Sequence, residues 1–252
     1  MATVLGIPIA PVDRAGAVER VVALMASGGH HQVVTVNPEF LVAARYRPMF
    51  AAILRRAALA TADGVGILLA ARLQGTPLQG RVTGTDLVVD LAQRAAELQW
   101  GIFLLGAAPG VAERAAETLR LGVPGVRVVG VWAGSPRADD EADILRRLAV
   151  ARPDVLLVAY GAPAQELWLA RNLAQTPAII GIGVGGAFDF LAGVKPRAPQ
   201  VLQRAGLEWL YRLLQEPWRA RRMLALPAFV ALVARDVLAQ RLRRRSRAGD
   251  IN

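Results

Sequence analysis

Two short polar motifs follow apolar runs in the first quarter of the chain. TVNPEF (35–40) places a hydroxyl, an amide and a carboxylate after the run QVV, and ADGVG (62–66) places Asp63 just before a flexible glycine. A carboxylate in such a position can act as a general base that accepts the proton of an attacking hydroxyl. Since ligands bind at the carboxyl ends of parallel strands, both motifs are expected at one crevice.

Two further motifs place polar side chains where helices are expected to begin, namely RVTGTDL (81–87) and YGAPAQE (160–166). Considered singly, Thr83, Asp86 and Glu166 are explained by capping, because such side chains satisfy free N–H groups or oppose the helix dipole. Their repeated placement on the same rim of the sheet favours a functional site.

A glycine-rich stretch, GIGVGGAFDF (181–190), contains the formal pattern G-x-G-x-x-G, with its third glycine at Gly186. A dinucleotide-binding turn needs a long helix directly after that glycine. The chain instead reaches Pro196 within a few residues, which leaves no room for such a helix. We therefore expect a close-packed turn that lines a pocket through Gly185. The alternative is a true dinucleotide-binding turn, which would make the protein an NAD(P)-dependent oxidoreductase.

Two other positions have both a structural and a functional interpretation. Asp189 is either a turn residue that caps the short segment after it or a ligand contact. GAAPG (106–110) follows an expected strand and opens a helix, so the N–H groups near Gly106 could meet a diphosphate or another polar ligand group. An ordinary strand-to-helix turn would have the same sequence.

Apolar runs and amphipathic segments alternate along most of the chain. This alternation predicts an α/β fold with a largely parallel sheet covered by helices on both faces. The runs expected to form strands are VLGIPI (4–9), QVVTV (32–36), GIFLLG (101–106), VRVVGVW (126–132), DVLLVAYG (154–161) and AIIGIGVG (178–185). The segments expected to form helices include 15–27, 85–99, 110–122, 139–151 and 163–174.

The strands stop near residue 195, so we expect a core of residues 1–195 and a helical, basic appendage of residues 196–252. From Lys195 onward there are 13 basic and four acidic residues. The apolar segment MLALPAFVALVA (223–234) is too short to span a bilayer, but its arginine flanks suit a helix that lies on a membrane. A non-catalytic membrane- or nucleic-acid-binding module is a second alternative, although the apolar segment favours lipid and no nucleic acid is expected.

The chain has no cysteine, so disulfides, zinc–thiolate sites and thiol catalysis are excluded. It also has no Asp-x-Asp pair at the end of an expected strand, and the acidic cluster at 139–143 precedes a helix, where acids oppose the helix dipole. We therefore expect no metal and no other cofactor. Arginines are the natural substitute for a metal, because a guanidinium pairs with two phosphate oxygens and keeps its charge in a dry site.

Taken together and in order, seven motifs resemble the WecG/TagA/CpsF family of bacterial glycosyltransferases (glycosyltransferase family 26) over about residues 4–225. They are TVNPE, ADGVG, RVTGTDL, GAPAQE, GVGGAFDFLAG, KPRAP and LEWLYRLLQEPWRARRM. The resemblance implies a Rossmann-like core with a carboxyl-terminal helical appendage that meets the inner face of the cell membrane. It implies inverting transfer of N-acetylmannosamine or a related sugar from a UDP-sugar to an undecaprenyl-diphosphate-linked sugar, in cell-envelope polysaccharide or teichoic acid synthesis.

The resemblance also assigns roles to residues of these motifs. It implies that Asp63 is the general base and that Thr35 is a neighbour that positions substrate. The residues that it places along the pocket are Asn37, Arg81 and Gln165, and the appendage residues that it places over the pocket are Arg212, Arg219 and Arg222.

Overall fold

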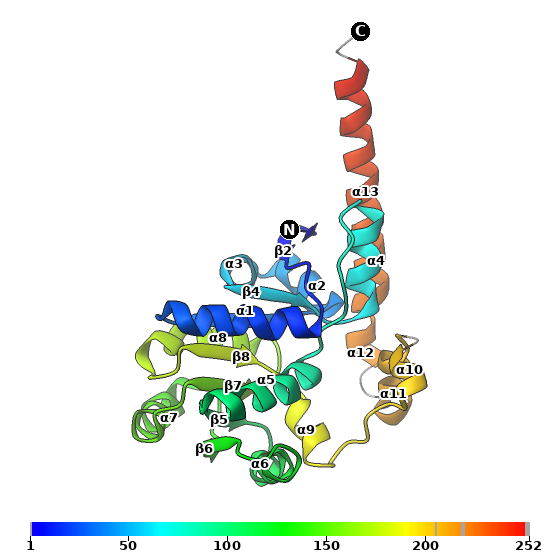
Figure 1. The fold of residues 1–252 in the computed structure, drawn as a ribbon. Helices are drawn as coiled ribbons and strands as arrows, with labels where there is room; N and C mark the ends of the chain where they lie inside the picture. The colour runs from blue at the N-terminus through cyan, green and yellow to red at the C-terminus, as the bar shows by residue number, and fades with distance from the viewer. Residues whose placement is uncertain (1, 205, 218–219, 250–252) are drawn as a thin grey trace.

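A computed structural model describes residues 2–204, 206–217 and 220–249, with the backbone alone at Arg204, Arg212, Arg221, Arg222 and 240–249. A parallel six-stranded sheet forms its centre, in the order β4-β3-β8-β7-β5-β6 (Figure 1). The strands are β3 (His31–Val36), β4 (Leu59–Ala62), β5 (Gly101–Gly106), β6 (Arg127–Trp132), β7 (Val155–Ala159) and β8 (Ile180–Gly183). The predicted α/β class with a largely parallel, Rossmann-like sheet is confirmed.

One predicted strand is wrong. Residues 4–9 do not form a continuous strand but contribute to an antiparallel hairpin of β1 (Ala2–Val4) and β2 (Ile7–Ile9), separate from the main sheet. The chain reverses at Leu5 and Gly6, whose φ angles are 49° and 79°. Glycine adopts such positive φ angles at little cost, so the glycine inside the apolar run marks the turn.

Successive side chains of the strands enter opposite layers, as the pleat of a buried sheet requires. On one face, Val33 belongs to a hydrophobic cluster that includes residues of α1 (Arg14–Ser27), α5 (Gly84–Leu98) and α6 (Val111–Gly122). On the other face, Val34 packs with the hairpin and with helices at the β3–β4 edge, while Leu156 packs beneath two helices at the opposite edge. The helices of this second face are α2 (Pro38–Tyr46), α3 (Pro48–Arg56), α7 (Ala138–Ala151) and α8 (Ala164–Asn172), followed by the 3₁₀ turn η1 (Leu173–Gln175).

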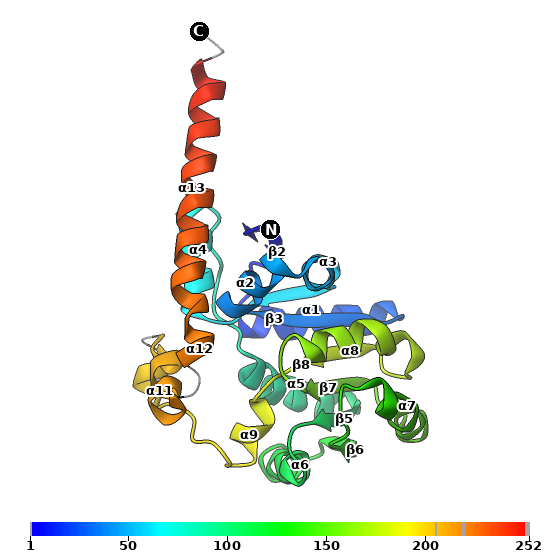
Figure 2. The same ribbon diagram turned by 180° about the vertical axis from the view of Figure 1, so that it is seen from behind.

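The remaining helices lie around the carboxyl edge of the sheet. They are α4 (Val65–Leu73), α9 (Ala187–Leu191), α10 (Gln200–Arg204), α11 (Glu208–Gln215), α12 (Ala220–Met223) and α13 (Ala225–Gly249). Beyond Lys195 every regular element of the described ranges is a helix. The first half of α13 runs beside α4, and its second half extends past the core (Figures 1 and 2).

Helix α13 is packed onto the core rather than tethered at a distance. Phe229 and Val233 are each 4% exposed and belong to the same hydrophobic cluster as α2, α3 and the β1–β2 hairpin. Gln74, just after α4, donates a 2.7 Å hydrogen bond to Asp236. Across the described ranges, we find no helix with the length and apolarity needed to cross a bilayer.

Candidate active site

A cavity of about 1070 Å³ opens at the carboxyl ends of β3, β4 and β8 and is closed on one side by the appendage. The chain passes from β3 to β4 on one side of β3 and places all later strands on its other side. Ligands usually bind at such a switch point of an open parallel sheet. Most of the predicted site residues line it, namely Thr35, Asn37, Asp63, Arg81, Gln165, Gly185 and Asp189. The structure therefore brings residues separated by up to 154 positions to one crevice.

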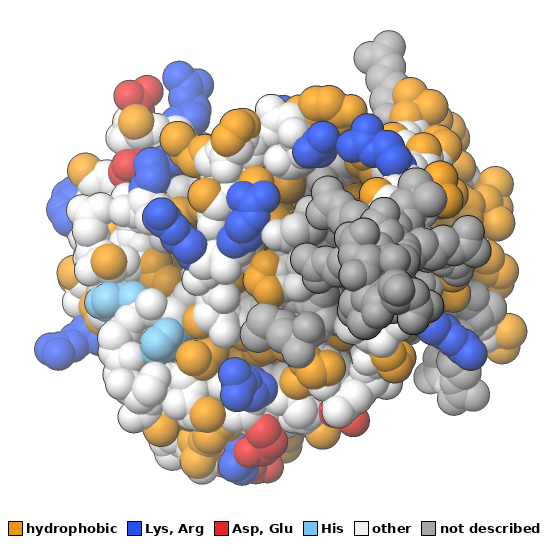
Figure 3. Space-filling model, turned by 90° about the horizontal axis from the view of Figure 1, so that it is seen from above, with side chains coloured by type: hydrophobic (Ala, Val, Ile, Leu, Met, Phe, Trp, Pro, Cys, Tyr) orange, Lys and Arg blue, Asp and Glu red, His pale blue; other side chains and the backbone are white. Residues whose placement is uncertain are grey.

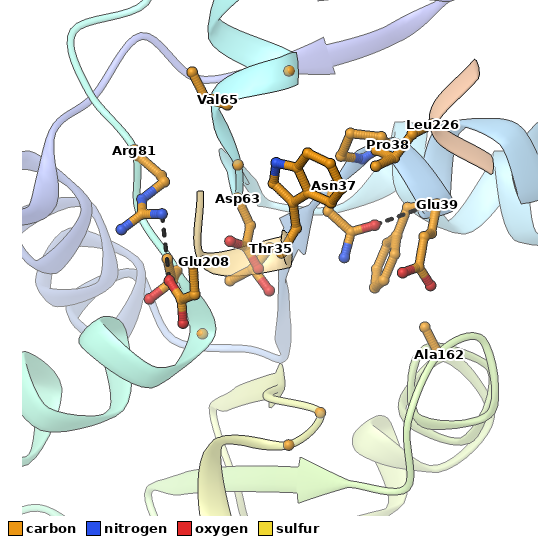
Figure 4. Close-up of a pocket in the computed structure, with 18 of the residues that line it drawn as sticks. Thr35, Asn37, Pro38, Glu39, Asp63, Val65, Arg81, Ala162, Glu208 and Leu226 are labelled. Atoms are coloured by element: carbon orange, nitrogen blue, oxygen red, sulfur yellow. Dashed lines mark hydrogen bonds and ion pairs between the residues drawn. The ribbon is translucent and has the colours of Figure 1, made fainter. Parts of the chain in front are cut away.

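Asp63, Thr35 and Asn37 come from adjacent strands. Asp63 directly follows β4, and its N–H donates a 2.7 Å hydrogen bond to the carbonyl of Val36 at the end of β3. Thr35 is 5% exposed, and Asn37 caps α2 by accepting a 3.0 Å bond from the N–H of Phe40. Figure 4 shows Asn37 and Glu39 on one side of Asp63 and Arg81 on the other. The carboxylate thus lies among polar residues of the cavity lining, and these residues together form its polar wall.

The polar wall that contains Arg81 includes the start of α5. Thr83 caps this helix, accepting a 3.1 Å bond from the N–H of Asp86, and Thr83, Gly84 and Thr85 all line the cavity. The N-terminus of a 15-residue helix favours negative charge through its dipole and its free N–H groups. Arg81 lies beside it and forms an ion pair with Glu208 of α11 at 3.4 Å. A diphosphate would find both a dipole and a guanidinium here.

Gln165 does more than line the cavity. Its side-chain oxygen accepts the N–H of Gly161, after β7, at 3.1 Å and the N–H of Gly185, after β8, at 3.0 Å. Its side-chain nitrogen donates a 2.7 Å bond to Glu166, which is fully buried. The amide therefore fixes two loops of the rim relative to each other, and a buried carboxyl fixes the amide.

Burial raises the pKa of Glu166 to about 7, because a charged carboxylate loses its hydration in the interior. Its second oxygen, Oε2, has no hydrogen-bond partner among the described residues. The sequence offered helix capping for Glu166 taken singly and a functional site for its motif together with the others. It did not reveal that this carboxyl group is buried beneath the rim.

The glycine pattern is explained by packing. A Cβ at Gly181 would lie 2.7 Å from Leu169, and one at Gly183 would lie 2.5 Å from Glu166, so both glycines let α8 approach β8. The helix that follows Gly186 is α9, with only five residues. The sequence predicted that no long helix could follow this glycine. The structure agrees, because α9 is too short for a dinucleotide-binding turn.

Another part of the cavity lining is apolar and comes mainly from α4 and the appendage. It includes Val65 and Leu69 of α4 and Leu226, Phe229 and Val233 of α13. A ligand with a polar head and an apolar tail would match the contrast between the two walls.

Some predicted positions are not brought to the cavity or are not described. Gly106 is absent from the described lining, and a Cβ there would lie 2.9 Å from the backbone of Ala159, so close strand packing accounts for it. Arg219 lies outside the described residues, as do the side chains of Arg212 and Arg222. Within the described part of the chain, no group of three or more histidine and acidic side chains could hold a metal ion.

Three charged residues of the cavity wall had no predicted role. Lys195 is 3.2 Å from Asp189 and 3.0 Å from Glu216, and Glu208 holds Arg81. Glu208 and Glu216 flank α11 at its two ends. Their pairing joins the core to the appendage, and no local sequence signal could have indicated which cation each glutamate contacts.

Comparison with known proteins places these observations in a family context. Residues 2–246 match the sequence profile of the Glycosyl transferase WecG/TagA/CpsF family. An N-acetylglucosaminyldiphosphoundecaprenol N-acetyl-beta-D-mannosaminyltransferase of Bacillus spizizenii is 35% identical over 201 residues, which cover 80% of this chain and 77% of that protein. Proteins of the same name from Bacillus subtilis and Staphylococcus aureus are 32% and 30% identical, each over 81% of this chain and 79% of its own length.

Proposed function

Because the chain belongs to the WecG/TagA/CpsF family of glycosyltransferases, we propose that it transfers N-acetylmannosamine or a related sugar from a UDP-sugar to an undecaprenyl-diphosphate-linked sugar. The product then enters cell-envelope polysaccharide or teichoic acid synthesis. The names of the relatives support the transferred sugar and the lipid-linked acceptor. The two contrasting walls of the cavity support a substrate pair with one lipid member.

The proposed reaction is a single displacement with inversion. The acceptor hydroxyl attacks the anomeric carbon, the bond between that carbon and the diphosphate oxygen breaks, and UDP leaves with the bonding electrons. Asp63 accepts the proton of the attacking hydroxyl, and Thr35 positions the substrate beside it. The location of Asp63 at the end of β4, in the wall of the cavity, is the observation on which this assignment rests.

The departing diphosphate gains negative charge, and cations of this chain stabilise it without a metal ion in our proposal. Arg81 and the N-terminus of α5 are the described groups suited to this role. Arg212, Arg219 and Arg222 add further positive charge from the appendage. The absence of an Asp-x-Asp pair at a strand end in the sequence supports the metal-independent route.

The lipid-linked acceptor requires the protein to work at a membrane surface. We place it peripherally on the inner face of the cell membrane, in contact through the appendage. Support comes from the excess of basic residues after Lys195 and from large exposed apolar side chains on α11, in the α12–α13 turn and on α13.

The test of the base is Asp63→Asn, assayed for transfer with a UDP-sugar and a short-chain polyprenyl-diphosphate-linked N-acetylglucosamine. We expect a rate loss of about 10² to 10⁴, the usual contribution of a general base. Asp139→Asn is the matched control, because Asp139 is exposed in the first turn of α7. A folded Asp63→Asn protein with nearly normal turnover would remove the assignment.

The donor and the metal-free route are tested together. A panel of UDP-sugars offered to the purified protein, with products identified by mass spectrometry, should give transfer from UDP-N-acetylmannosamine or a close relative. Excess EDTA should leave the rate unchanged. Loss of activity on chelation, restored by a divalent cation, would refute metal independence while leaving the donor identified.

A further inference from the structure

Lys195 is the only lysine in the chain, and it lies in the cavity wall between two carboxylates. Its Nζ is 3.2 Å from Asp189 Oδ2 and 3.0 Å from Glu216 Oε1. Asp189 belongs to α9 of the core, whereas Glu216 follows α11 of the appendage. The ammonium group therefore joins the two parts of the protein at the edge of the candidate active site.

The backbone around Lys195 is well defined. Val194 and Lys195 both donate their N–H groups to the carbonyl of Asp189, at 2.9 and 3.1 Å, and Gly193 has the positive φ of 65° that ends α9. Asp189 is thus both the carbonyl anchor of this turn and one partner of the ammonium. The core half of the arrangement, Asp189 with Lys195, does not depend on the appendage.

The appendage contributes carboxylates from both ends of α11 to this arrangement. Glu216 lies one residue beyond α11, and Glu208, which pairs with Arg81, is the first residue of the same helix. One helix of the appendage therefore places a carboxylate on each of two cations of the cavity wall. Both cations are suited to phosphate oxygens, and a phosphate beside either one would meet the negative charge of its glutamate partner.

From this geometry we infer that Lys195 is a diphosphate-binding residue whose partner Glu216 competes with the ligand. In the ligand-free protein Glu216 forms an ion pair with the ammonium group at 3.0 Å. When a diphosphate binds, a phosphate oxygen takes the place of Glu216, while Asp189 keeps the ammonium oriented. Three N–H donors on the ammonium allow the carboxylate of the core and the phosphate to be held together.

The inference extends the proposed function, and it rests on that proposal for the choice of a diphosphate as ligand. Both substrates contain this group, because the donor is a nucleoside diphosphate sugar and the acceptor is a lipid diphosphate. The chemistry recognised is the same in each. The experiment must therefore separate the two sources.

A competing carboxylate and a purely structural ion pair give opposite results for one substitution. If Glu216 only fastens the appendage, then Glu216→Gln and Lys195→Met both weaken ligand binding. If Glu216 competes with the ligand, Glu216→Gln strengthens binding and Lys195→Met weakens it. Adding Glu216→Gln to Lys195→Met should then give no gain, since the cation for which ligand and glutamate compete is missing.

The measurement is isothermal titration calorimetry of the full chain with inorganic diphosphate, UDP and geranyl diphosphate. We expect Lys195→Met to weaken binding on the order of tenfold, Lys195→Arg to restore most of it, and Glu216→Gln to strengthen it by roughly threefold to tenfold. Glu97→Gln, in the exposed Arg94–Glu97 pair of α5, is the matched control and should change nothing. Circular dichroism establishes that each variant is folded.

Each result has a defined consequence. Variant effects confined to UDP place Lys195 at the donor, effects confined to geranyl diphosphate place it at the acceptor, and either supports the inference. Unchanged affinities for all three ligands, weaker binding in both single variants, or a wild-type chain that binds none of the ligands overturns it. If the variants change ligand binding as expected but no sugar is transferred, the proposed function fails and the inference stands. If the wild type transfers sugar and Lys195→Met leaves ligand binding unchanged, the inference fails and the proposed function stands.

Discussion

Glu166 is a fully buried carboxyl group directly beneath the rim of the cavity. It accepts a hydrogen bond from Gln165, whose own oxygen holds the loops at Gly161 and Gly185. Burial raises the pKa of Glu166 to about 7 from an ordinary value of 4.5. The charge state of one buried side chain therefore changes within the physiological pH range, at a position that supports the site.

The raised pKa has a definite effect on stability. Between about pH 4.5 and pH 7 the folded chain binds a proton at Glu166 that the unfolded chain has released, so stability falls as the pH rises through this window. Glu166→Gln removes the titration. We expect this variant to exceed the wild type by up to about 3 kcal/mol in free energy of unfolding at pH 8 and to equal it near pH 4.

Urea unfolding followed by circular dichroism from pH 4 to pH 8 measures this difference. Glu113→Gln, in the first turn of α6, is a suitable control because Glu113 is exposed. A difference between Glu166→Gln and the wild type that stays constant across the range would contradict the raised pKa.

Gly183 shows why a glycine in this stretch is required. A Cβ at this position would lie 2.5 Å from Glu166 Oε1 and 2.6 Å from Gln165 Nε2. We expect Gly183→Ala to destabilise the fold by about 1–3 kcal/mol through overpacking and to lower transfer by displacing Gln165. Gly186→Ala is the matched comparison, because the nearest atom to its Cβ would be 3.6 Å away. Thermal unfolding and a transfer assay on both variants test this, and equal behaviour of the two would refute it.

The candidate site was predictable from sequence to the extent that it follows strand ends. Thr35, Asn37 and Asp63 were found because Thr35 lies near the carboxyl end of β3, while Asn37 and Asp63 directly follow β3 and β4. The residues that contact Lys195 and Gln165 could not be predicted from the sequence, since those contacts depend on how α8 and α11 pack in three dimensions. The glycine pattern was visible, but its cause is the side chain of Glu166 on a neighbouring helix.

Among the elements, the order of strands and helices was largely predictable. Strands that are buried on both faces appear as continuous apolar runs, and β5 and β7 are fully buried along their length. The β1–β2 hairpin was mistaken for one strand because its turn occupies two residues within such a run. The docking of α13 could not be predicted, since an apolar segment flanked by arginines suits a membrane and a protein core equally well.

One row of apolar side chains packs α13 onto the core. Phe229 and Val233 are buried four positions apart on one face of the helix, and Val237 is partly buried one turn further. We expect Phe229→Ala to weaken the docking of α13 by about 3–5 kcal/mol, the usual cost of removing a buried phenyl ring. Hydrogen exchange should then become faster in α13 and α2 while β5 and β7 keep their protection.

Val230→Ala is the control for this experiment, because Val230 is adjacent in sequence but 64% exposed. Unchanged exchange in the Phe229→Ala protein would show that α13 is held by other contacts. Destabilisation of the entire sheet would instead show that appendage and core unfold as one unit.

The exposed side of the appendage is apolar as well. Viewed from above, hydrophobic side chains gather along the side of the protein where α13 lies (Figure 3). Leu224, Val230 and Leu238 are 68%, 64% and 59% exposed. Exposed apolar patches of this kind mark membrane or protein contacts.

We expect the double variant Leu224→Ser, Leu238→Ser to bind anionic vesicles about tenfold more weakly than the wild type, since each buried leucine contributes about 1 kcal/mol or more to insertion. Transfer to a water-soluble acceptor should be unaffected. Leu121→Ser is the control, because Leu121 is 81% exposed on α6, at the far end of the molecule from α13. Vesicle co-sedimentation measures the effect, and equal loss in control and double variant would exclude a dedicated membrane face.

The cluster that receives Phe229 also contains residues of the β1–β2 hairpin, α2 and α3, all of which precede α13 in the chain. The hairpin, α2 and α3 are therefore synthesised long before the helix that covers them. During translation this side of the sheet stays open, while the layer of α1, α5 and α6 can already close. Expression in the cell should consequently depend on chaperones that shield the open side until α13 has emerged.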